Sequence, residues 1–396
     1  MDESARWLIG AAVFVVIVAL PLIVSGPGND LDVANVFRSG RSIARHFSYV
    51  PSRAPGAPVH EAIAGVLDLV GGPVLTNLAS LVAAGVLLYC LDVLLRQEGV
   101  RAGGRWAVAL VAVNPWFVIA ATSTADYVFA LAFVVGAALA LRGGRPVIAG
   151  MLAAASMGCR VGSAALIAGI LVAELTQPRS WGEVDDSGTA RRRRNVLVAG
   201  IITVLGTALV FVPAFLSAGG LSFTQNDFST SGPIAQLGRA AVKDLTLFGV
   251  ATTVVLILIV PALWAALKTW RTSWLVRFAG VGFVLSQLLF IRFPWKMAHL
   301  LPCLLCLAIL LAVALDTKPI ALMVLVALQL AFCVVRIDVV QPNNPNEATG
   351  GRAGVTVGWG PVVQDFNCRR EHPDAYRGRQ KVEVEAAWDC AKPFGG

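Results

Sequence analysis

Long apolar segments, separated by short polar ones, occupy most of this 396-residue chain. Several approach the roughly 20 residues that a helix needs to cross the hydrocarbon core of a bilayer, and the shorter ones fit short or tilted helices. The pattern therefore predicts an all-α polytopic membrane protein with about eleven transmembrane helices. The expected spans cover residues 7–25, 74–95, 104–121, 125–141, 146–159, 161–176, 196–216, 246–267, 274–291, 298–315 and 319–336.

The loop between the first two spans, residues 26–73, has a different pattern. Val33, Val36, Phe37 and Ile43 recur at near-helical spacing with arginines between them, and a second apolar stripe follows a turn rich in Pro and Gly. Amphipathic helices of this kind lie in the membrane interface. We therefore expect two interfacial helices in this first external loop.

The chain becomes polar after the last span. Residues 1–336 are predicted to form the transmembrane domain, and residues 337–396 a small extracytoplasmic C-terminal segment, for which an envelope protein is a candidate partner. Cys368 and Cys390 are the two cysteines of this tail. In an oxidising compartment they would form a disulfide that stabilises the tail by about 3 kcal/mol in the chain-entropy model.

Composition excludes an ordinary soluble protein, in which about 25% of residues are charged. Apolar residues make up 57% of the chain and charged residues 14%, with a mean hydropathy of +0.72. The net charge is +8, but no basic stripe with interleaved aromatic residues accompanies it. We therefore expect membrane lipids as partners and no nucleic acid.

Basic residues in the loops predict the orientation, because cytoplasmic loops retain positive charge. Fifteen fall in loops on the N-terminal side, against nine in the opposite loops outside the tail. The bias predicts a multi-pass protein of the cell membrane with a cytoplasmic N-terminus and an extracytoplasmic C-terminus. It requires residues 146–176 to form two short helices that turn near Arg160. A single long helix there would reverse every later segment.

Polar residues gather in the loops that this topology places outside. The first external segment has two aspartates directly after the first span and then a Ser-Arg-Ala-Pro-Gly-Ala-Pro turn, and later outer turns carry further cations and an Asn-Pro step. The sequences concerned are Gly28-Asn-Asp30-Leu-Asp32, Ser52-Arg53 to Pro58 with Glu61, Asn114-Pro115, Cys159-Arg160 and Arg292-Phe-Pro-Trp-Lys296-Met-Ala-His299.

This layout resembles the integral-membrane glycosyltransferases of the GT-C fold, including mannosyltransferase-like members, over residues 7–336. The resemblance implies a sugar donor linked to polyprenyl phosphate and an extracytoplasmic glycan, lipid or protein as acceptor. It also implies inversion at the sugar carbon and a first-loop aspartate as the base.

The chemistry of such a transfer needs a base for the acceptor hydroxyl and cations for the departing phosphate. Asp30 and Asp32 are the candidate bases. The alternative role is to cap the helix that begins near Asp32, as aspartate often does, and we expect one of the two to be the cap and the other the base. We favour Asp30 narrowly as the base.

Five basic residues are candidates for holding the donor phosphate, since a guanidinium offers a bidentate fork and an ammonium a point charge. For a single interfacial cation, contact with lipid headgroups is an equally good explanation. An arginine between two apolar half-helices, in contrast, needs a partner or a water-filled cavity. The five candidates are Arg53, Arg160, Arg292, Lys296 and His299.

Glu61 and Asp126 have two interpretations each. Glu61 either positions the acceptor or a cation, or is the acid that suits the first turn of a helix. Asp126 starts a span, where capping is the favoured role. No cofactor and no metal ligand set is predicted, although a divalent metal remains compatible with the chemistry.

A non-catalytic protein is the alternative class: a transporter or flippase for lipid-linked glycans, or an assembly partner for the cell envelope. A transporter lines both leaflets with polar groups, whereas an enzyme gathers its polar groups around one outer cavity. The spans also contain no chain of carboxylates of the kind that proton-coupled transport requires. The sequence therefore favours the enzyme.

Overall fold

The computed structural model of the protein describes residues 10–177, 186–220, 232–340, 354–372 and 390. The start of the first expected span (7–9) and most of the expected C-terminal segment (341–353, 373–389 and 391–396) lie outside the described residues.

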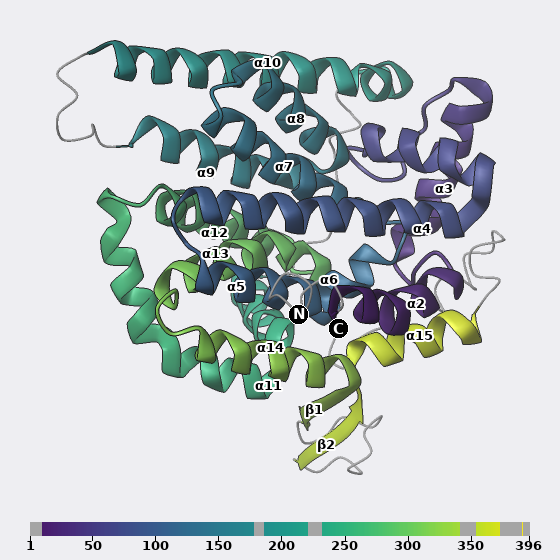
Figure 1. The fold of residues 1–396 in the computed structure, drawn as a ribbon. Helices are drawn as coiled ribbons and strands as arrows, with labels where there is room; N and C mark the ends of the chain where they lie inside the picture. The colour runs from purple at the N-terminus through teal and green to yellow at the C-terminus, as the bar shows by residue number, and fades with distance from the viewer. Residues whose placement is uncertain (1–9, 178–185, 221–231, 341–353, 373–389, 391–396) are drawn as a thin grey trace.

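The described part is a bundle of helices with one β-hairpin, from which α15 leads back to the bundle (Figure 1). The elements are η1 (Val15–Ala19), α2 (Leu20–Val24), α3 (Leu31–His46), α4 (Pro58–Gln97), α5 (Ala102–Val113), α6 (Pro115–Ala121), α7 (Tyr127–Arg142), α8 (Pro146–Cys159), η2 (Val161–Ser163), α9 (Ala164–Leu175), α10 (Asp186–Ala218), α11 (Pro233–Leu267), η4 (Lys268–Arg271), α12 (Trp274–Arg292), η5 (Met297–Leu300), α13 (Leu301–Ala314), α14 (Pro319–Val334), β1 (Val335–Val340), β2 (Gly354–Trp359) and α15 (Pro361–Glu371).

Several helices are long and apolar enough to cross a membrane. Within the described ranges there are five, or six if the bent pair α5 and α6 counts as one span, and further apolar helices of 10–17 residues accompany them. The predicted polytopic helical membrane protein is therefore confirmed. Helix length does not establish the predicted count of eleven crossings, because the shorter helices fall below the length of a full span.

The helices form two packed groups on either side of α4 and α9 (Figure 1). On one side α10 packs against α8, α8 against α7, and α7 against α4. On the other side α9 packs against α12, α12 against α13, and α13 and α14 against α5. In the segment Met297–Ala314, which consists of η5 and α13, 67% of the residues are buried. In the most apolar 18-residue stretches of α10 and of α11, only 17% are buried. An apolar helix enclosed by protein is a core helix, whereas α10 and α11 present apolar side chains outward, as lipid-facing helices do.

Residues 26–73 contain α3 and the first part of α4, at the places where two helices were predicted. Their backbones touch where Gly40 meets Gly65, since a Cβ on Gly65 would lie 2.1 Å from the carbonyl oxygen of Gly40. Gly72, with φ 62°, breaks α4 before Pro73. A proline disfavours helical backbone at the preceding residue, so the amphipathic start of α4 is separated from its membrane span at the expected position.

The expected span over residues 104–121 is not one continuous helix, because the helix breaks at Asn114. The axes of α5 and α6 differ by 67°. The Asn114 side chain accepts the N–H groups of Trp116 (3.1 Å) and Phe117 (3.4 Å) and so caps α6. Pro115 has no N–H to satisfy at the first helical position. The Asn-Pro step that the sequence shows is therefore a helix start inside an apolar run.

The stretch 146–176 forms two helices, α8 and α9, as predicted. The break lies at Arg160, whose backbone is extended (φ −158°, ψ 114°). Arg142, before α8, donates a hydrogen bond of 2.9 Å to Gln177, after α9. The chain therefore returns to the end of the bundle from which it left, and Arg160 lies at the opposite end.

The C-terminal segment departs from the all-α expectation. Strand β1 begins directly after α14 and pairs antiparallel with β2, with Val335 opposite Trp359. The predicted domain boundary at residues 336 and 337 thus falls inside a strand. Helix α15 then packs against α2, α6 and α14, with Val362 in an apolar cluster with Leu22 and Val118. The tail therefore forms part of the packed body through α15.

We expect Gly65→Ala to destabilise the protein by about 1–3 kcal/mol, the usual effect of overpacking, because α3 and α4 must move apart to admit the methyl group. The thermal unfolding midpoint in detergent measures this effect. Gly85→Ala on the same helix is the matched control, since a Cβ there meets nothing within 4 Å. Equal midpoints for the two variants would contradict the backbone contact.

Candidate active site

Charged side chains from five chain segments meet at one end of the bundle, the end at which α8 turns into α9. Lys296, which precedes η5, places Nζ 2.5 Å from Asp30 Oδ1 and 2.7 Å from Asp32 Oδ2. Arg53 contacts Asp32 at 3.0 Å. The contacts therefore form a line of alternating charge that begins with two carboxylates sharing one ammonium.

The line continues at the start of α7. Arg53 also pairs with Asp126, and Arg160 Nη1 lies 3.1 Å from Asp126 Oδ1. The side chain of Asp126 is 2% exposed. A carboxylate this buried requires partners, and here two arginines supply them. In full the order is Asp30, Lys296, Asp32, Arg53, Asp126 and Arg160, with three negative and three positive groups.

Asp30 and Asp32 owe their positions to the start of α3. The helix begins at Leu31, and Asp30 is its N-cap, with Oδ1 accepting the backbone N–H of Asp32 at 2.8 Å. The capping residue is therefore the one favoured as the base. Asp32 points from the first turn of α3 to Lys296 and Arg53. The expectation that the cap and the favoured base are separate residues is therefore not met, and the capping hydrogen bond orients the Asp30 carboxylate.

Glu61 holds the loop that carries Arg53. Its side chain is fully buried and accepts hydrogen bonds from Ser39 Oγ (2.9 Å), the backbone N–H of Ala57 (3.2 Å), and the N–H (3.2 Å) and hydroxyl of Ser52. It lies in the first turn of α4. This placement supports the interpretation of Glu61 as a first-turn acid that ties the loop to α3 and α4.

The residue that sequence reasoning missed is Asp126. It does occupy the N-cap position of α7, but its side chain makes no capping hydrogen bond and pairs with Arg53 and Arg160 instead. The predicted capping role is therefore wrong. Asp126 could have been identified from Arg160, because an arginine between two apolar half-helices needs a partner such as a carboxylate. Tyr127 completes this corner, with the Arg160 guanidinium 3.9 Å from the centre of its ring.

The two remaining cation candidates lie differently. His299 is near the line of charges: its ring centre is 6.0 Å from that of Tyr127, and Nδ1 is 3.3 Å from the carbonyl oxygen of Phe293. Arg292 is exposed and lies over the Phe293 ring at 4.9 Å. The structure therefore groups Arg53, Arg160, Lys296 and His299 and leaves Arg292 at the surface.

A small cavity opens beside the charges. Its walls combine carboxylates, a guanidinium and a phenol with two valines of α3, so one side is polar and the other apolar. The lining residues are Asp30, Asp32, Val33, Val36, Arg53, Thr124, Ala125, Asp126 and Tyr127.

The paired charges hold one another ionised. Burial by itself would raise the pKa of Asp32, but Lys296 and Arg53 outweigh it and keep that pKa below the usual range. Burial would likewise lower the pKa of Lys296 and of Arg53, and the neighbouring carboxylates raise both above their ordinary values. Asp32, Lys296 and Arg53 are therefore charged at neutral pH.

The same ion pairs occupy the carboxylate oxygens that a resident metal ion would need as ligands. A divalent cation at the carboxylates would have to displace Lys296 or Arg53, because these side chains already contact their oxygens. Another possible ligand group in the described chain is Glu371, His372 and Cys390, but the Cys390 sulfur is in a disulfide. The donor sets described here therefore do not suit a metal ion.

Comparison with known proteins supports the fold. No family model and no curated protein sequence matches the chain. Two crystal structures of ArnT from Cupriavidus metallidurans are similar to it, one bound to undecaprenyl phosphate (TM-score 0.59, 17% identity) and one in the apo state (TM-score 0.54, 16% identity). Each covers 98% of this chain and 75% of the ArnT chain. The GT-C fold implied by the sequence resemblance is therefore confirmed.

The lowered pKa of Asp32 predicts how stability depends on pH. The unfolded chain binds a proton at this carboxylate near pH 3.9, before the native protein does, so the contribution of Asp32 is present above that pH and is lost as the pH falls further. Asp32→Asn should therefore be less stable than wild type at pH 7, by about 1.5–3 kcal/mol for lost charged hydrogen bonds. The difference should shrink below pH 4.

Thermal unfolding midpoints of both proteins across pH 3–7 test this. Asp92→Asn serves as control, because Asp92 pairs with Arg96 within one helix at the surface, where ion pairs contribute little. A constant difference between wild type and Asp32→Asn over the whole range would refute the prediction.

Proposed function

We propose that this protein is an inverting membrane glycosyltransferase that transfers a sugar from a polyprenyl-phosphate donor to an extracytoplasmic glycan, lipid or protein. The observation that carries the proposal is the line of alternating charges along one cavity at one end of the bundle. The ArnT-like fold supports it, and ArnT in one of the similar structures holds undecaprenyl phosphate.

Lys296 is the cation best placed to receive the donor phosphate. The linkage between a polyprenyl phosphate and a sugar is a phosphodiester with one negative charge, and each cation of the site already contacts a carboxylate. The phosphate must therefore compete with these carboxylates for a cation. Lys296 and Arg53 each contact two carboxylates, but Lys296 rather than Arg53 contacts Asp30. By turning to the phosphate, Lys296 can keep Asp32 while releasing Asp30.

Asp30 released in this way is the proposed base. It takes the proton of the acceptor hydroxyl, whose oxygen attacks C1 of the sugar as the bond from C1 to the phosphate oxygen breaks. The polyprenyl phosphate leaves with both electrons of that bond, and Lys296 and Arg53 stabilise its charge. A single displacement of this kind inverts the configuration at C1. Asp32, held by two cations, keeps them in place.

The position of α3 gives a lipid donor a route to the cavity. Val33 and Val36 of α3 line the cavity. Phe47, at the C-terminal end of the same helix, is 95% exposed, as a side chain inserted among lipids would be. The polyprenyl chain would thus lie along the interfacial helix, with its phosphate at Lys296.

The orientation proposed from the basic loops agrees with this placement. Arg142 and Arg192 both donate hydrogen bonds to Gln177, at the end of the α8–α9 hairpin opposite to Arg160. If the basic end is cytoplasmic, the charged cavity and α15 face the extracytoplasmic side. A lipid-linked sugar on that side would reach the site without crossing the membrane.

The function is tested with purified protein in proteoliposomes that contain a polyprenyl-phosphate sugar, mannose first and other sugars after it. Transfer of labelled sugar to an added glycan, with release of polyprenyl phosphate, would support the enzyme. Movement of the lipid-linked sugar between leaflets without release would instead support the flippase alternative.

Asp30→Asn and Asp32→Asn should each reduce transfer by about 10²-fold or more, the usual contribution of general base catalysis or charge positioning. Labelled product is measured at equal amounts of folded protein. Full activity in both variants would exclude the proposed base and its neighbour.

Lys296→Ala should weaken binding of polyprenyl phosphate by about tenfold or more, because it removes a charged contact of about 1.5–3 kcal/mol. Binding is measured as the ligand-induced rise in unfolding temperature. The control is Lys318→Ala, an exposed lysine at the N-cap of α14. The site assignment fails if the two variants bind the lipid equally well.

A further inference from the structure

Arg369 of α15 lies fully inside the protein, between the C-terminal ends of two helices. Its side chain is 0% exposed. Nη1 donates to the carbonyl oxygens of Leu22 (3.0 Å) in α2, Gly26 (3.2 Å) just after α2, and Thr122 (2.8 Å) at the end of α6. One guanidinium thus serves two helix ends at once.

The last carbonyl groups of a helix have no partner within the helix and carry the negative end of its dipole. Two such ends that meet away from water repel each other unless a cation lies between them. A guanidinium suits this position because it stays charged when buried and presents several donors in one plane. Arg369 therefore holds α2 and α6 together at their C-termini.

Both helix ends lead directly to the acids of the candidate active site. The chain runs from α2 through residues 25–29 to Asp30, and from α6 through residues 123–125 to Asp126. Asn29, the neighbour of Asp30, donates to the backbone and side-chain oxygens of Asp365, each at 3.0 Å. Asp365 in turn pairs with Arg369 at 2.8 Å.

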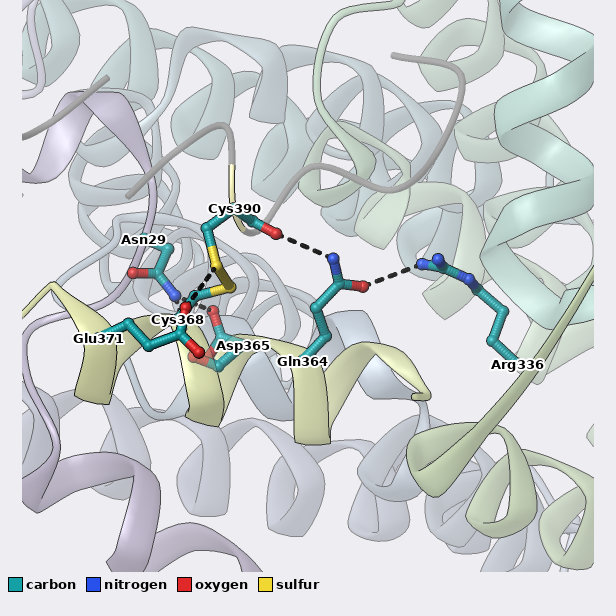
Figure 2. Close-up of a disulfide and its surroundings, with 7 residues drawn as sticks. All are labelled: Asn29, Arg336, Gln364, Asp365, Cys368, Glu371 and Cys390. Carbon is teal, nitrogen blue, oxygen red and sulfur yellow. Dashed lines mark hydrogen bonds between the residues drawn. A yellow bond between two sulfur atoms is a disulfide. The ribbon is translucent and has the colours of Figure 1, made fainter. Parts of the chain in front are cut away.

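Helix α15 is itself fixed by contacts drawn in Figure 2. A disulfide joins Cys368, next to Arg369, to Cys390, the pair expected from the sequence. Gln364 donates to the carbonyl oxygen of Cys390 (2.9 Å) and accepts from Arg336 of β1 (3.0 Å). These contacts hold α15 in place in addition to its contacts with the ends of α2 and α6.

We propose that Arg369 is a positioning residue, which sets the spacing of Asp30 and Asp126 through the two helix ends that it holds. The kinetic part of this inference rests on the proposed function, and the structural part does not. Helix α15 and its disulfide then support the active site, although none of their residues lines the cavity.

The test compares Arg369→Gln with Arg370→Gln in the full chain. Arg370 is the matched control, since it is the next residue on α15, is exposed and lies over the Phe366 ring. Arg369→Gln should speed hydrogen exchange in peptides covering residues 22–30 and 121–127, with other helices unchanged. The variant should lower kcat by about tenfold or more, because Asp30 and Asp126 would be misplaced. The donor KM should stay within about threefold of wild type, because the cations of the site lie on other segments. Arg370→Gln should behave as wild type in both measurements.

Arg369→Lys retains the charge with fewer donors and should restore part of kcat and of the local protection. It also takes the place of Arg369→Gln if that variant does not fold. Wild-type kcat and exchange in both Arg369 variants would overturn the proposal, and so would faster exchange spread evenly over all helices. If the wild type transfers no sugar, the proposed function fails, and local exchange alone then decides the role of Arg369.

Discussion

The constraint behind this site is that a charge removed from water needs a partner. Six ionisable side chains, brought by five separate segments, satisfy one another in a single line from Asp30 to Arg160. Removing any one group leaves a neighbour unbalanced in a medium of low dielectric. The mutual neutralisation also explains how so many charges can sit at the boundary of an apolar bundle, and it makes the site responsive to an incoming anion.

The charged groups come from helix termini and breaks, which is where backbone polar groups also need partners. The irregular segments between them are held by uncharged side chains. Asn77 donates to the carbonyl oxygens of Ile23 (3.2 Å) and Gly26 (2.8 Å), and its own oxygen accepts from Thr124 (3.0 Å). The N–H of Thr124 donates to Pro27 at 2.8 Å. Non-helical backbone inside a membrane protein is tolerated only with such partners.

Patterns local in the sequence predicted the fold well. Helical periodicity predicted α3 and the first part of α4, and the basic loops on both sides of residues 146–176 predicted the α8–α9 hairpin. Residue type directed attention to Asp30, Arg53, Arg160 and Lys296, because each is costly to bury without a partner, and the structure brings all four into one line of ion pairs.

Features that depend on distant partners were not predictable in the same way. Asp126 has an ordinary capping position, and its true partners lie 34 and 73 residues away. The Asn-Pro step at residue 114 is a local signal, but the partner of the Asn114 amide is Gln329, which accepts its hydrogen bond at 2.9 Å. The docking of α15 has no local signal, since Arg369 contacts carbonyl oxygens that every residue type can offer.

The hydrogen bond between Asn29 and Asp365 joins residues 336 positions apart. Helices α2 and α3 are made early in synthesis, whereas α15 leaves the ribosome only after all the other described helices have been made. Until then, residues 25–30 of the nascent chain lack their contacts with Asp365 and Arg369. If Arg369 positions Asp30 and Asp126 as proposed, the two acids reach their final separation only after α15 has been made.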